Sequence, residues 1–425
     1  VFAQDFTFMG GSMGEMHNKK IAKAIEQALK VGCPIIGLLD SGGARIQEGI
    51  AALDTGGAIF KLNTMASGVI PQISAILGPC AGIAVYSPSL TDFTLMVKKI
   101  SNMFITGPDV IKTVTGEEID FESLGGSKIH NEKSGVAHFA AENEKQCLQT
   151  IKLLLSYLPQ NNLENAPYAN MSDAIERPIN LKNIVPQDSK KTYDVRSVIK
   201  EVLDKRSFLE IQELYAQNAV IGLGRLNNNA VGIAATQPSV LAGCLDINSS
   251  GKISRFVRFC DCFNIPLINF VDVTGYLPGT DQEHNGIIRH GAKILYAYSE
   301  ATVPKISLVM RKAYGGAYIA LVSKEMGYDK VMAWPNAEIA VMGAEQAVNI
   351  VNRKELTGKD KEKIKDAKVK EYKEKFLNPY VAAQQGRIDL IIEPKDTRKI
   401  LIKCLEMLLN KRERRPAKKH GNMPL

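Results

Sequence analysis

The sequence PIIGLLD at residues 34–40, which runs directly into Ser41-Gly42-Gly43, shows the pattern on which the chain is built. The pattern returns as PLINFVD at residues 266–272, which runs into Val273-Thr274-Gly275, so that residue numbers in the two copies differ by a constant offset of 232. Lys20-Ile21 and Lys252-Ile253 keep this offset, and Gly82 and Gly316 occupy similar glycine turns at an offset of 234. Two unrelated strand–helix units would share some of these features, but the constant spacing favours an internal repeat.

Both halves predict the same order of elements. A helix-like stretch (residues 18–31 and 251–263) precedes the buried strand and its glycine turn. A second short strand (residues 72–77 and 305–310) precedes a second glycine turn that opens a helix. Strands that alternate with helices are typical of an α/β fold with largely parallel strands.

A linker separates the two halves. Residues 158–193 contain four prolines and many Asn and Asp residues, a composition that is typical of a connecting segment. With the boundary placed inside this segment, we expect two domains at residues 1–175 and 176–425. We also expect the first domain to lack a segment that precedes Val1, because the chain does not open with Met.

The composition bounds the function classes. Of the 425 residues, 45% are hydrophobic and 23% are charged, as in ordinary globular proteins. Lys and Arg outnumber Asp and Glu by 53 to 45, and the net charge of +8 suits an anionic small ligand. A nucleic-acid partner would need a basic stripe with aromatic neighbours, whereas the most charged stretch, residues 353–375, mixes both signs and predicts a solvated helix face.

Membranes and metals are not indicated either. No apolar run approaches the ~20 residues of a membrane span, and no signal peptide is visible. We therefore expect a cytoplasmic protein (in the mitochondrial matrix in a eukaryote) with no direct membrane insertion. The seven cysteines form no CxxC pair and are odd in number, which predicts reduced thiols. His284 and His290 lie six positions apart and predict no metal pair, so we expect no metal on this chain.

Glycine turns between a strand and a helix have a specific chemical use. The first amides of a helix have no carbonyl partners within it, and two converging amides form an oxyanion hole. Glycine lets a ligand approach the main chain closely. The halves offer four such turns, at residues 41–44, 81–83, 274–275 and 315–317.

The glycine turns do not match the motifs of other catalytic or nucleotide-binding sites. The glycine turns contain no dinucleotide GxGxxG pattern and no GxxxxGK[ST] phosphate loop. Ser41 does not lie in a GxSxG elbow, so it fits a turn-former or helix cap better than a nucleophile. Asp40 and Asp272 end buried strands, where an aspartate more often caps a turn than acts as a base. The sequence thus favours chemistry in which backbone dipoles stabilise charge and a substrate or cofactor moves the proton.

These motifs also carry a family resemblance. The chain resembles the biotin-dependent acyl-CoA carboxyltransferases of the crotonase superfamily, the family of the propionyl-CoA carboxylase β subunit and the methylmalonyl-CoA decarboxylase α subunit. The resemblance covers nearly the whole chain, and its most specific stretches are SGGARIQEG (41–49), SGVIPQISAILGPCAG (67–82), GYLPGTDQEHNGIIRHGAK (275–293), RKAYGGAY (311–318) and KHGNMPL (419–425).

The resemblance implies a fold and an assembly. The fold would be two tandem crotonase-like (ClpP/crotonase) ββα superhelical domains, the N-terminal one binding acyl-CoA and the C-terminal one binding biotin. The assembly would be a homohexamer, a trimer of dimers, in which the first domain of one subunit faces the second domain of its partner. Carboxybiotin would arrive on a biotin carboxyl carrier protein that works with a biotin carboxylase subunit.

The resemblance also implies site residues. The amides near Gly82 and Ile83 would hold the thioester oxygen of the acyl-CoA enolate, and those of Gly316 and Ala317 would hold the ureido oxygen of biotin. The remaining residues would shape the two sites: Gly42, Gly43 and Ala44 in the first and Gly275 in the second. The biotin nitrogen would take the α-proton, and the enolate would attack carbon dioxide.

Two positions depart from the family pattern. The family usually has glycine where this chain has Ile83, although the amide is kept. After RKAYGGAY, propionyl-CoA carboxylases usually carry Asp, whereas this chain carries Ile319, as relatives that handle other acyl groups often do. Ile319 is either a specificity residue or a packing residue.

Three functions remain open. The first is the carboxyltransferase subunit of an acyl-CoA carboxylase that acts on a short-chain acyl-CoA such as propionyl-CoA or acetyl-CoA. The second is the carboxyltransferase α subunit of a sodium-pumping methylmalonyl-CoA or glutaconyl-CoA decarboxylase. The third is a non-catalytic scaffold, which the intact glycine turns disfavour.

Overall fold

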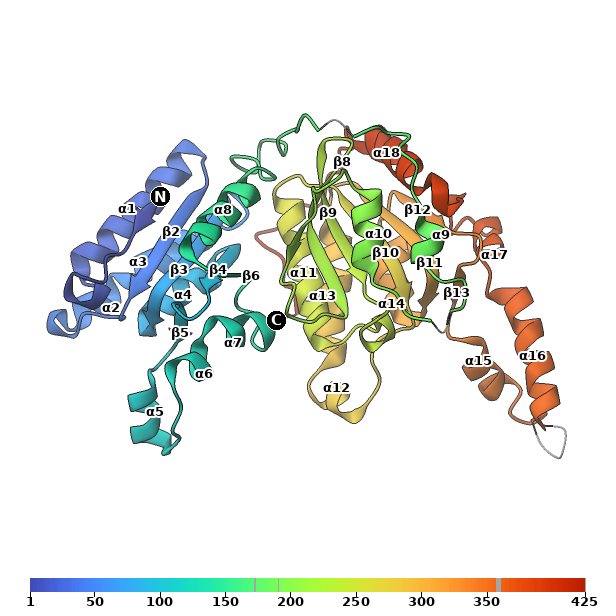
Figure 1. Ribbon diagram of the computed structural model, residues 1–425, viewed down its shortest axis with the longest axis horizontal. Coiled ribbons are helices and arrows are strands. Elements are labelled where there is room, and N and C mark those ends of the chain that lie inside the picture. Colours follow the sequence, from blue (N-terminus) through green and yellow to red (C-terminus); the bar gives the residue numbers. More distant parts are fainter. Residues whose placement is uncertain (172, 190, 357–360, 425) are drawn as a thin grey trace. The chain divides into compact units, whose positions relative to one another are not determined.

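The structure is a computed structural model that describes residues 1–171, 173–189, 191–356 and 361–424. It divides into two compact units (Figure 1). Unit 1 comprises Val1–Pro167, Ile211–Ala216 and Cys262–Asn264, and unit 2 comprises Tyr168–Glu210, Gln217–Asp261 and Ile265–Leu425. Within the described ranges, no helix has both the length and the apolar character of a membrane span.

Unit 1 is built on a parallel sheet in the order β1-β2-β3-β4-β6, in which β5 pairs with the end of β3. β3 is buried along most of its length, as expected of a central strand between covered faces. The strands are β1 Phe2–Ala3, β2 Ile35–Ser41, β3 Gln72–Ala81, β4 Phe93–Val97, β5 Asn102–Phe104 and β6 Phe139–Ala141.

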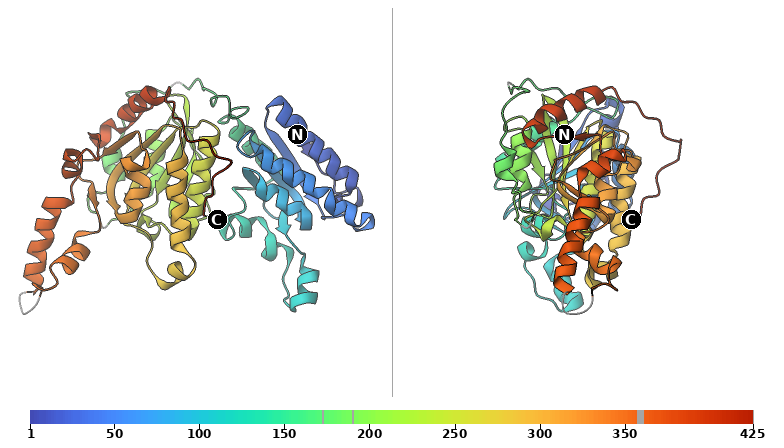
Figure 2. Two further views of the ribbon diagram at one scale, coloured as in Figure 1. Left: turned by 180° about the vertical axis from the view of Figure 1, so that it is seen from behind. Right: turned by 90° about the vertical axis from the view of Figure 1, so that its right-hand side faces the viewer.

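Helix α1 (Glu15–Val31) shows why these residues form a helix on the sheet. Its apolar residues Ile21, Ile25 and Ala28 recur every three or four positions and are buried. It ends where Gly32 adopts the left-handed conformation (φ 72°). α1 packs against α3 (Gly56–Ala66), and both are drawn in blue in Figures 1 and 2. The other helices of unit 1 are α2 Ile50–Asp54, α4 Tyr86–Leu90, α5 Pro108–Thr115, α6 Phe121–Gly125, α7 Ser127–Glu132 and α8 Glu144–Leu155.

Unit 2 has a larger sheet in the order β14-β12-β11-β10-β9-β8-β7, in which β13 pairs with the end of β11. β8 and β9 form an antiparallel hairpin, and its two-residue turn, Asn227-Asn228, has positive φ angles of 48° and 69°. The strands are β7 Leu209–Ile211, β8 Ala219–Leu226, β9 Asn229–Thr236, β10 Leu267–Val273, β11 Lys305–Tyr314, β12 Lys330–Ala333, β13 Glu338–Ala340 and β14 Leu390–Ile391.

The helices of unit 2 pack around a core that the central strands share with α10 and α18. α16 contains no buried residue and extends away from the rest of the unit (Figure 2), which agrees with the solvated face predicted for its part of residues 353–375. Residues 357–360 lie outside the described residues. The helices are α9 Leu181–Ile184, α10 Val195–Val202, α11 Ile247–Cys262, α12 Thr280–His284, α13 Ile287–Glu300, α14 Gly315–Val322, α15 Ala344–Val351, α16 Lys361–Phe376, α17 Pro379–Gln384 and α18 Thr397–Leu408.

The two sheets repeat one another. β10 begins at an offset of 232 from β2, and β11 begins at an offset of 233 from β3. The strand pairs share a register shift: Leu39 lies opposite Ile76 but Ser41 opposite Cys80, and Val271 lies opposite Val309 but Val273 opposite Ala313. Each second strand continues past its predicted end, to Ala81 in β3 and to Tyr314 in β11, because after the shift it pairs with β5 or β13.

Candidate active site

The first glycine turn follows β3. Gly82 has a φ of +56° and opens a short 3₁₀ helix, Gly82–Val85, which no side chain caps. The first amides of a helix have no acceptor within it. Among the described residues, no backbone hydrogen bond outside the regular elements starts at the amide of Gly82 or Ile83. Both amides are therefore available to an acceptor that is not part of this chain.

The second glycine turn follows β11 in the same way. Gly315 has a φ of +57° and opens α14, again without a capping side chain. The strand pairings place Ala81 opposite Phe104 and Tyr314 opposite Ala340, so Gly82 corresponds to Gly315 rather than to Gly316. The offset of 234 inferred from the sequence is therefore too long by one position at this anchor. In the structural register, Ile83 corresponds to Gly316.

The side chain of Ile83 has its own space. It packs partly buried against the core of unit 1. A Cβ atom placed on Gly56 of α3 would lie 2.3 Å from Ile83 Cδ1, so the glycine on α3 leaves the room that the isoleucine fills. The bulky residue therefore points its side chain at α3, and its amide stays at the start of the turn.

A pocket of about 690 Å³ opens beside the second turn. Gly315 and Gly316 line it, and Ile319, which is 48% exposed, contributes an apolar wall. Ala317 has no exposed surface and is not among the lining residues, so the accessible amides of this turn are those before it. The other lining residues are Tyr318, Ser323, Glu325, Ile339, Ala340, Val341, Tyr372, Phe376, Val381, Ala382, Gln385 and Arg387.

The two charged side chains that line this pocket pair with each other, and its tyrosine Tyr318 is partly buried. Arg387 and Glu325 form an ion pair with each other at 2.7 Å. Burial raises the pKa of Tyr318 above its ordinary value. Tyr276, whose ring lies 3.4 Å from the position of a Cβ on Gly316, has a pKa raised by burial to about 12. The pocket thus offers amides and an apolar wall.

The glycines after β2 and β10 have a different part. The amide of Gly42 donates to the carbonyl oxygen of Gly10 at 2.9 Å, and that of Gly43 donates to Ser41 Oγ at 3.2 Å, so neither is free for a ligand. Gly43 and Gly275 have φ angles of +101° and +140°.

The carbonyl oxygens of these turns support the chain that lies beside them. The carbonyl of Gly43 accepts from Met13 N at 2.7 Å, and that of Gly275 accepts from Leu245 N at 3.0 Å. Ala44 forms a bridge with Met13. These residues hold the backbone of their turns through their carbonyl oxygens and their conformation, and their role in shaping a ligand site stays a prediction.

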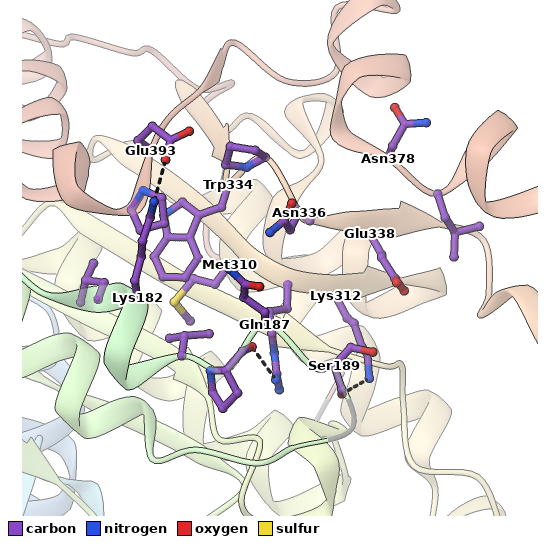
Figure 3. A pocket seen from close by; sticks show the side chains of 18 residues that line it. Lys182, Gln187, Ser189, Met310, Lys312, Trp334, Asn336, Glu338, Asn378 and Glu393 are labelled. Atoms are coloured by element: carbon purple, nitrogen blue, oxygen red, sulfur yellow. Dashed lines mark hydrogen bonds and ion pairs between the residues drawn. The ribbon is translucent and has the colours of Figure 1, made fainter. Parts of the chain in front are cut away.

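The sequence did not predict a second pocket, of about 610 Å³, at the carboxyl end of β11 (Figure 3). Its charged groups have partners: Lys312 Nζ donates to the carbonyl oxygen of Ser189 at 2.8 Å, and Lys182 lies 3.7 Å from Glu393. Arg311, also part of its wall, pairs with Asp272. Among the described residues, no cluster of three or more His, Cys, Asp or Glu side chains could hold a metal ion.

Comparison with known proteins places the chain among carboxyltransferases. Residues 1–423 match the carboxyl transferase domain family. The carboxyltransferase subunit of propionyl-CoA carboxylase from Haloferax mediterranei is 59% identical over 100% of this chain and 83% of its own length. The methylmalonyl-CoA decarboxylase α subunit of Veillonella parvula is 57% identical over 100% of this chain and 82% of its own length.

A solved structure is similarly close. The transcarboxylase 12S structure, described as a hexamer with methylmalonyl-coenzyme A and methylmalonic acid bound, superposes with a TM-score of 0.97 at 54% identity. The match covers 100% of this chain and 82% of that chain.

Proposed function

Because the chain belongs to the carboxyl transferase domain family and is the carboxyltransferase subunit of a biotin-dependent acyl-CoA carboxylase, we propose that it carboxylates the α-carbon of a short-chain acyl-CoA such as propionyl-CoA or acetyl-CoA. The carboxyl group would come from carboxybiotin. The same comparisons confirm the fold class predicted from the sequence, two tandem crotonase-like α/β domains related by an internal repeat.

The observation that carries the proposal is the pair of matched glycine turns. Each follows a strand with the same register shift and presents an amide that has no partner among the described residues, at Ile83 in the first half and at Gly316 in the second. We assign Gly82 and Ile83 to the thioester oxygen of the acyl-CoA. We assign Gly316, with the neighbouring amide of Gly315 in place of the buried Ala317, to the ureido oxygen of biotin.

The residues present fit a biotin headgroup. A ureido ring is neutral and planar, and the pocket of unit 2 combines amide donors with an apolar wall formed by Ile319, Ile339 and Val341. The two charged side chains of the pocket neutralise each other. Bound carboxybiotin would supply carbon dioxide and a basic nitrogen for the α-proton. The chain itself would supply preorganised amides where negative charge develops on oxygen.

The acyl-CoA would bind to the first half of the chain, residues 1–175, and biotin to the second, residues 176–425. Gly42, Gly43, Ala44 and Gly275 would hold the two turns in shape. The partners would be a biotin carboxylase and a biotin carboxyl carrier protein, in a homohexamer like that of the transcarboxylase 12S relative.

A second function is favoured by one comparison. The decarboxylase α subunit of Veillonella parvula is nearly as similar as the carboxylase subunit of Haloferax mediterranei, at 57% against 59% identity. The same amides would serve the reverse direction, from a methylmalonyl-type CoA to biotin. Partners captured from the source cell discriminate between the two: a biotin carboxylase supports the first function and a membrane-embedded subunit supports the second.

The proposal predicts that Gly316→Pro abolishes transfer. The substitution removes one amide donor, and loss of an oxyanion donor typically lowers kcat about 10²–10³-fold. Gly316→Ala is the matched control, because it keeps the amide and its Cβ would lie 3.4 Å from Tyr276, an ordinary contact. The assay follows carboxylation of acetyl-, propionyl- and butyryl-CoA with carboxybiotin.

Two outcomes contradict the proposal. Wild-type turnover by a folded Gly316→Pro variant would remove the assigned role of the second turn. Failure of the wild-type protein to carboxylate any acyl-CoA, or to decarboxylate a malonyl-type CoA in the presence of biotin, would favour a scaffold.

A further inference from the structure

We propose that Asp272 and Arg311 are positioning residues for the second glycine turn, because their buried ion pair fixes the register in which β11 runs into Gly315 and Gly316. The inference rests on the proposed function, since that function assigns the turn to the reaction. Neither residue touches the pocket beside the turn, so both would act through the backbone.

Asp272 lies at the register shift between β10 and β11. One residue of β10 stands there against three residues of β11, between the pairs Val271–Val309 and Val273–Ala313. The carboxylate of Asp272 binds the residues of β11 that have no opposite residue in β10. Its Oδ2 accepts from Arg311 Nε at 2.7 Å, and its Oδ1 accepts from the amide of Lys312 at 3.2 Å. The carboxylate thus holds β11 at two of the three residues that depart from regular pairing.

Asp272 is itself firmly held. It is 2% exposed, and its amide donates to Thr236 Oγ1 at 2.9 Å while the Thr236 hydroxyl donates to its carbonyl at 3.0 Å. The hydroxyl of Tyr193 donates to Oδ2 at 3.1 Å. Burial and the charge of Asp272 raise the pKa of Tyr193 well above its ordinary value, so this hydroxyl remains a donor. A carboxylate with three donors from protein groups is stable at this depth.

The guanidinium of Arg311 also binds the irregular segment of unit 2 that precedes α10. It lies over the ring of Tyr193, with Cζ 4.8 Å from the ring centroid. Its Nη1 donates to the carbonyl oxygens of Asp188 at 3.1 Å and Lys191 at 2.8 Å. Next to it, Lys312 reaches Ser189, as Figure 3 shows. The end of β11 is therefore held by hydrogen bonds to Asp272 of β10 and to the backbone between Pro186 and α10.

The first half has the same register shift but no ion pair at it. Asp40 occupies the place of Asp272, at the shift between the pairs Leu39–Ile76 and Ser41–Cys80. At the offset of 233 that relates β3 to β11, Gly78 and Pro79 replace Arg311 and Lys312. Glycine has no side chain and proline has no amide hydrogen, so both donors of Asp272 are lost together.

The consequence is visible at Asp40. Its buried Oδ1 has no hydrogen-bond partner in the part of the chain that the structure describes, and it lies 2.1 Å from where a Cβ on Gly78 would stand. The fixed φ of Pro79 and the room at Gly78 hold the shift in the first half. The ion pair is thus specific to the second half, and the register shift can form without it, as the first half shows.

The test compares two ways of removing the pair. Asp272→Asn with Arg311→Met leaves nothing in its place, and we expect kcat for carboxyl transfer to fall about 10–100-fold, as for a catalytic group displaced by ~1 Å. The KM for acyl-CoA, which the first half would bind, should stay within about twofold because that site is unaltered. Arg311→Gly with Lys312→Pro gives β11 the glycine and proline that β3 has at the corresponding positions. We expect this variant to retain at least about a third of the wild-type kcat if the register of β11 is what matters.

A purely structural role would make both variants lose activity in proportion to their thermal stability. A folded Asp272→Asn/Arg311→Met protein with wild-type kcat would overturn the inference. If that protein does not fold, Arg311→Lys decides: it keeps the charge but not the planar fork, we expect an approximately tenfold lower kcat with unchanged KM, and wild-type kcat would again overturn the inference.

Amide hydrogen exchange separates this inference from the proposed function. Within residues 313–322, the amides that are hydrogen-bonded in the wild type should exchange faster in Asp272→Asn/Arg311→Met and stay protected in Arg311→Gly/Lys312→Pro, whether or not the protein carboxylates acyl-CoA. An inactive wild type with this exchange pattern would refute the function and keep the positioning role. An active wild type with identical exchange in all variants would refute the positioning role alone.

Discussion

Asp40 is the residue at which the first half departs most from the second. Its buried Oδ1 has no partner, and burial, with help from the charges of Asp5 and Glu144, raises the pKa of the carboxyl. A raised folded-state pKa means that the folded protein holds this proton more tightly than the unfolded chain. Stability is therefore lost as the pH rises through the raised pKa.

Asp40→Asn removes the charge and leaves a carbonyl oxygen for the buried position, so we expect a higher midpoint of thermal unfolding at pH 7. The gain should disappear near pH 3, where Asp40 is protonated in both states. Differential scanning calorimetry at the two pH values measures the effect. Asp366→Asn, at an exposed residue of α16, is the control for the general loss of one negative charge. A variant less stable than the wild type at pH 7 would show that the carboxylate has a favourable role.

At this scale the sequence predicted the glycine turns better than the side chains that support them. The glycine turns are readable because glycine before a helix has few other uses, and Ser41 forms the turn that was predicted, with Oγ bonded to Gly11 and Gly43. The Asp272–Arg311 pair was missed because its members are far apart in the chain and meet only when β10 and β11 pair. Aligning the halves at 233, which sets Arg311 against Gly78, is the signal that reveals it.

Among the elements, the strands β3 and β11 ran longer than predicted. Gly78-Pro79 in the first half ends most strands, and the sequence gives no sign that a register shift lets the strand continue past it. The antiparallel hairpin of β8 and β9 was also not predicted. Its strands are buried on nearly every residue, so they lack the alternation that distinguishes an edge hairpin from a parallel core strand.

Helix α13 contributes a prediction about pH. At its carboxyl end the buried ammonium of Lys305 donates to the carbonyl oxygens of Tyr298 at 2.7 Å and Ala301 at 2.9 Å. Burial lowers the pKa of Lys305 to about 8. The unfolded chain therefore binds more protons than the folded protein above that value, and stability should rise with pH between about 8 and 10.

We expect the wild type to gain about 1–3 kcal/mol relative to Lys305→Met between pH 7 and pH 10, measured as the difference in free energy of unfolding in urea. Lys324, a partly exposed lysine paired with Asp389, gives the control variant Lys324→Met. Parallel pH profiles for the wild type and Lys305→Met would show that Lys305 titrates normally in the folded protein.

The whole molecule was predicted in its architecture, because duplication and strand–helix alternation are properties of long stretches of sequence. In the two-unit division of the structure, segments 211–216 and 262–264 belong to unit 1 although they lie beyond residue 175. Composition and periodicity do not encode such crossings, since they arise from packing between short segments that are distant in the chain.

Assembly is a property of the whole molecule, and the surface offers a place to test it. Ile46, Ile50 and Leu53 follow the glycine turn at residues 41–44 and are 88%, 77% and 50% exposed. Exposed apolar groups that cluster in this way mark protein contacts. Under the proposed hexamer they would be covered by a neighbouring subunit, and burying a glutamate there without a partner is unfavourable by several kcal/mol.

We therefore expect Ile50→Glu to dissociate the hexamer and to lower carboxyl transfer in parallel, because each complete site would need halves from two subunits. Light scattering coupled to size exclusion measures the change, from a particle close to six times the 46.6 kDa of one chain to a smaller one. Leu163→Glu, at a leucine 90% exposed and remote in sequence from both turns, should leave mass and turnover unchanged. If Ile50→Glu remained hexameric and active, the apolar residues of α2 would lie on an outer face, and the first turn would have to form its site without a neighbour at this surface.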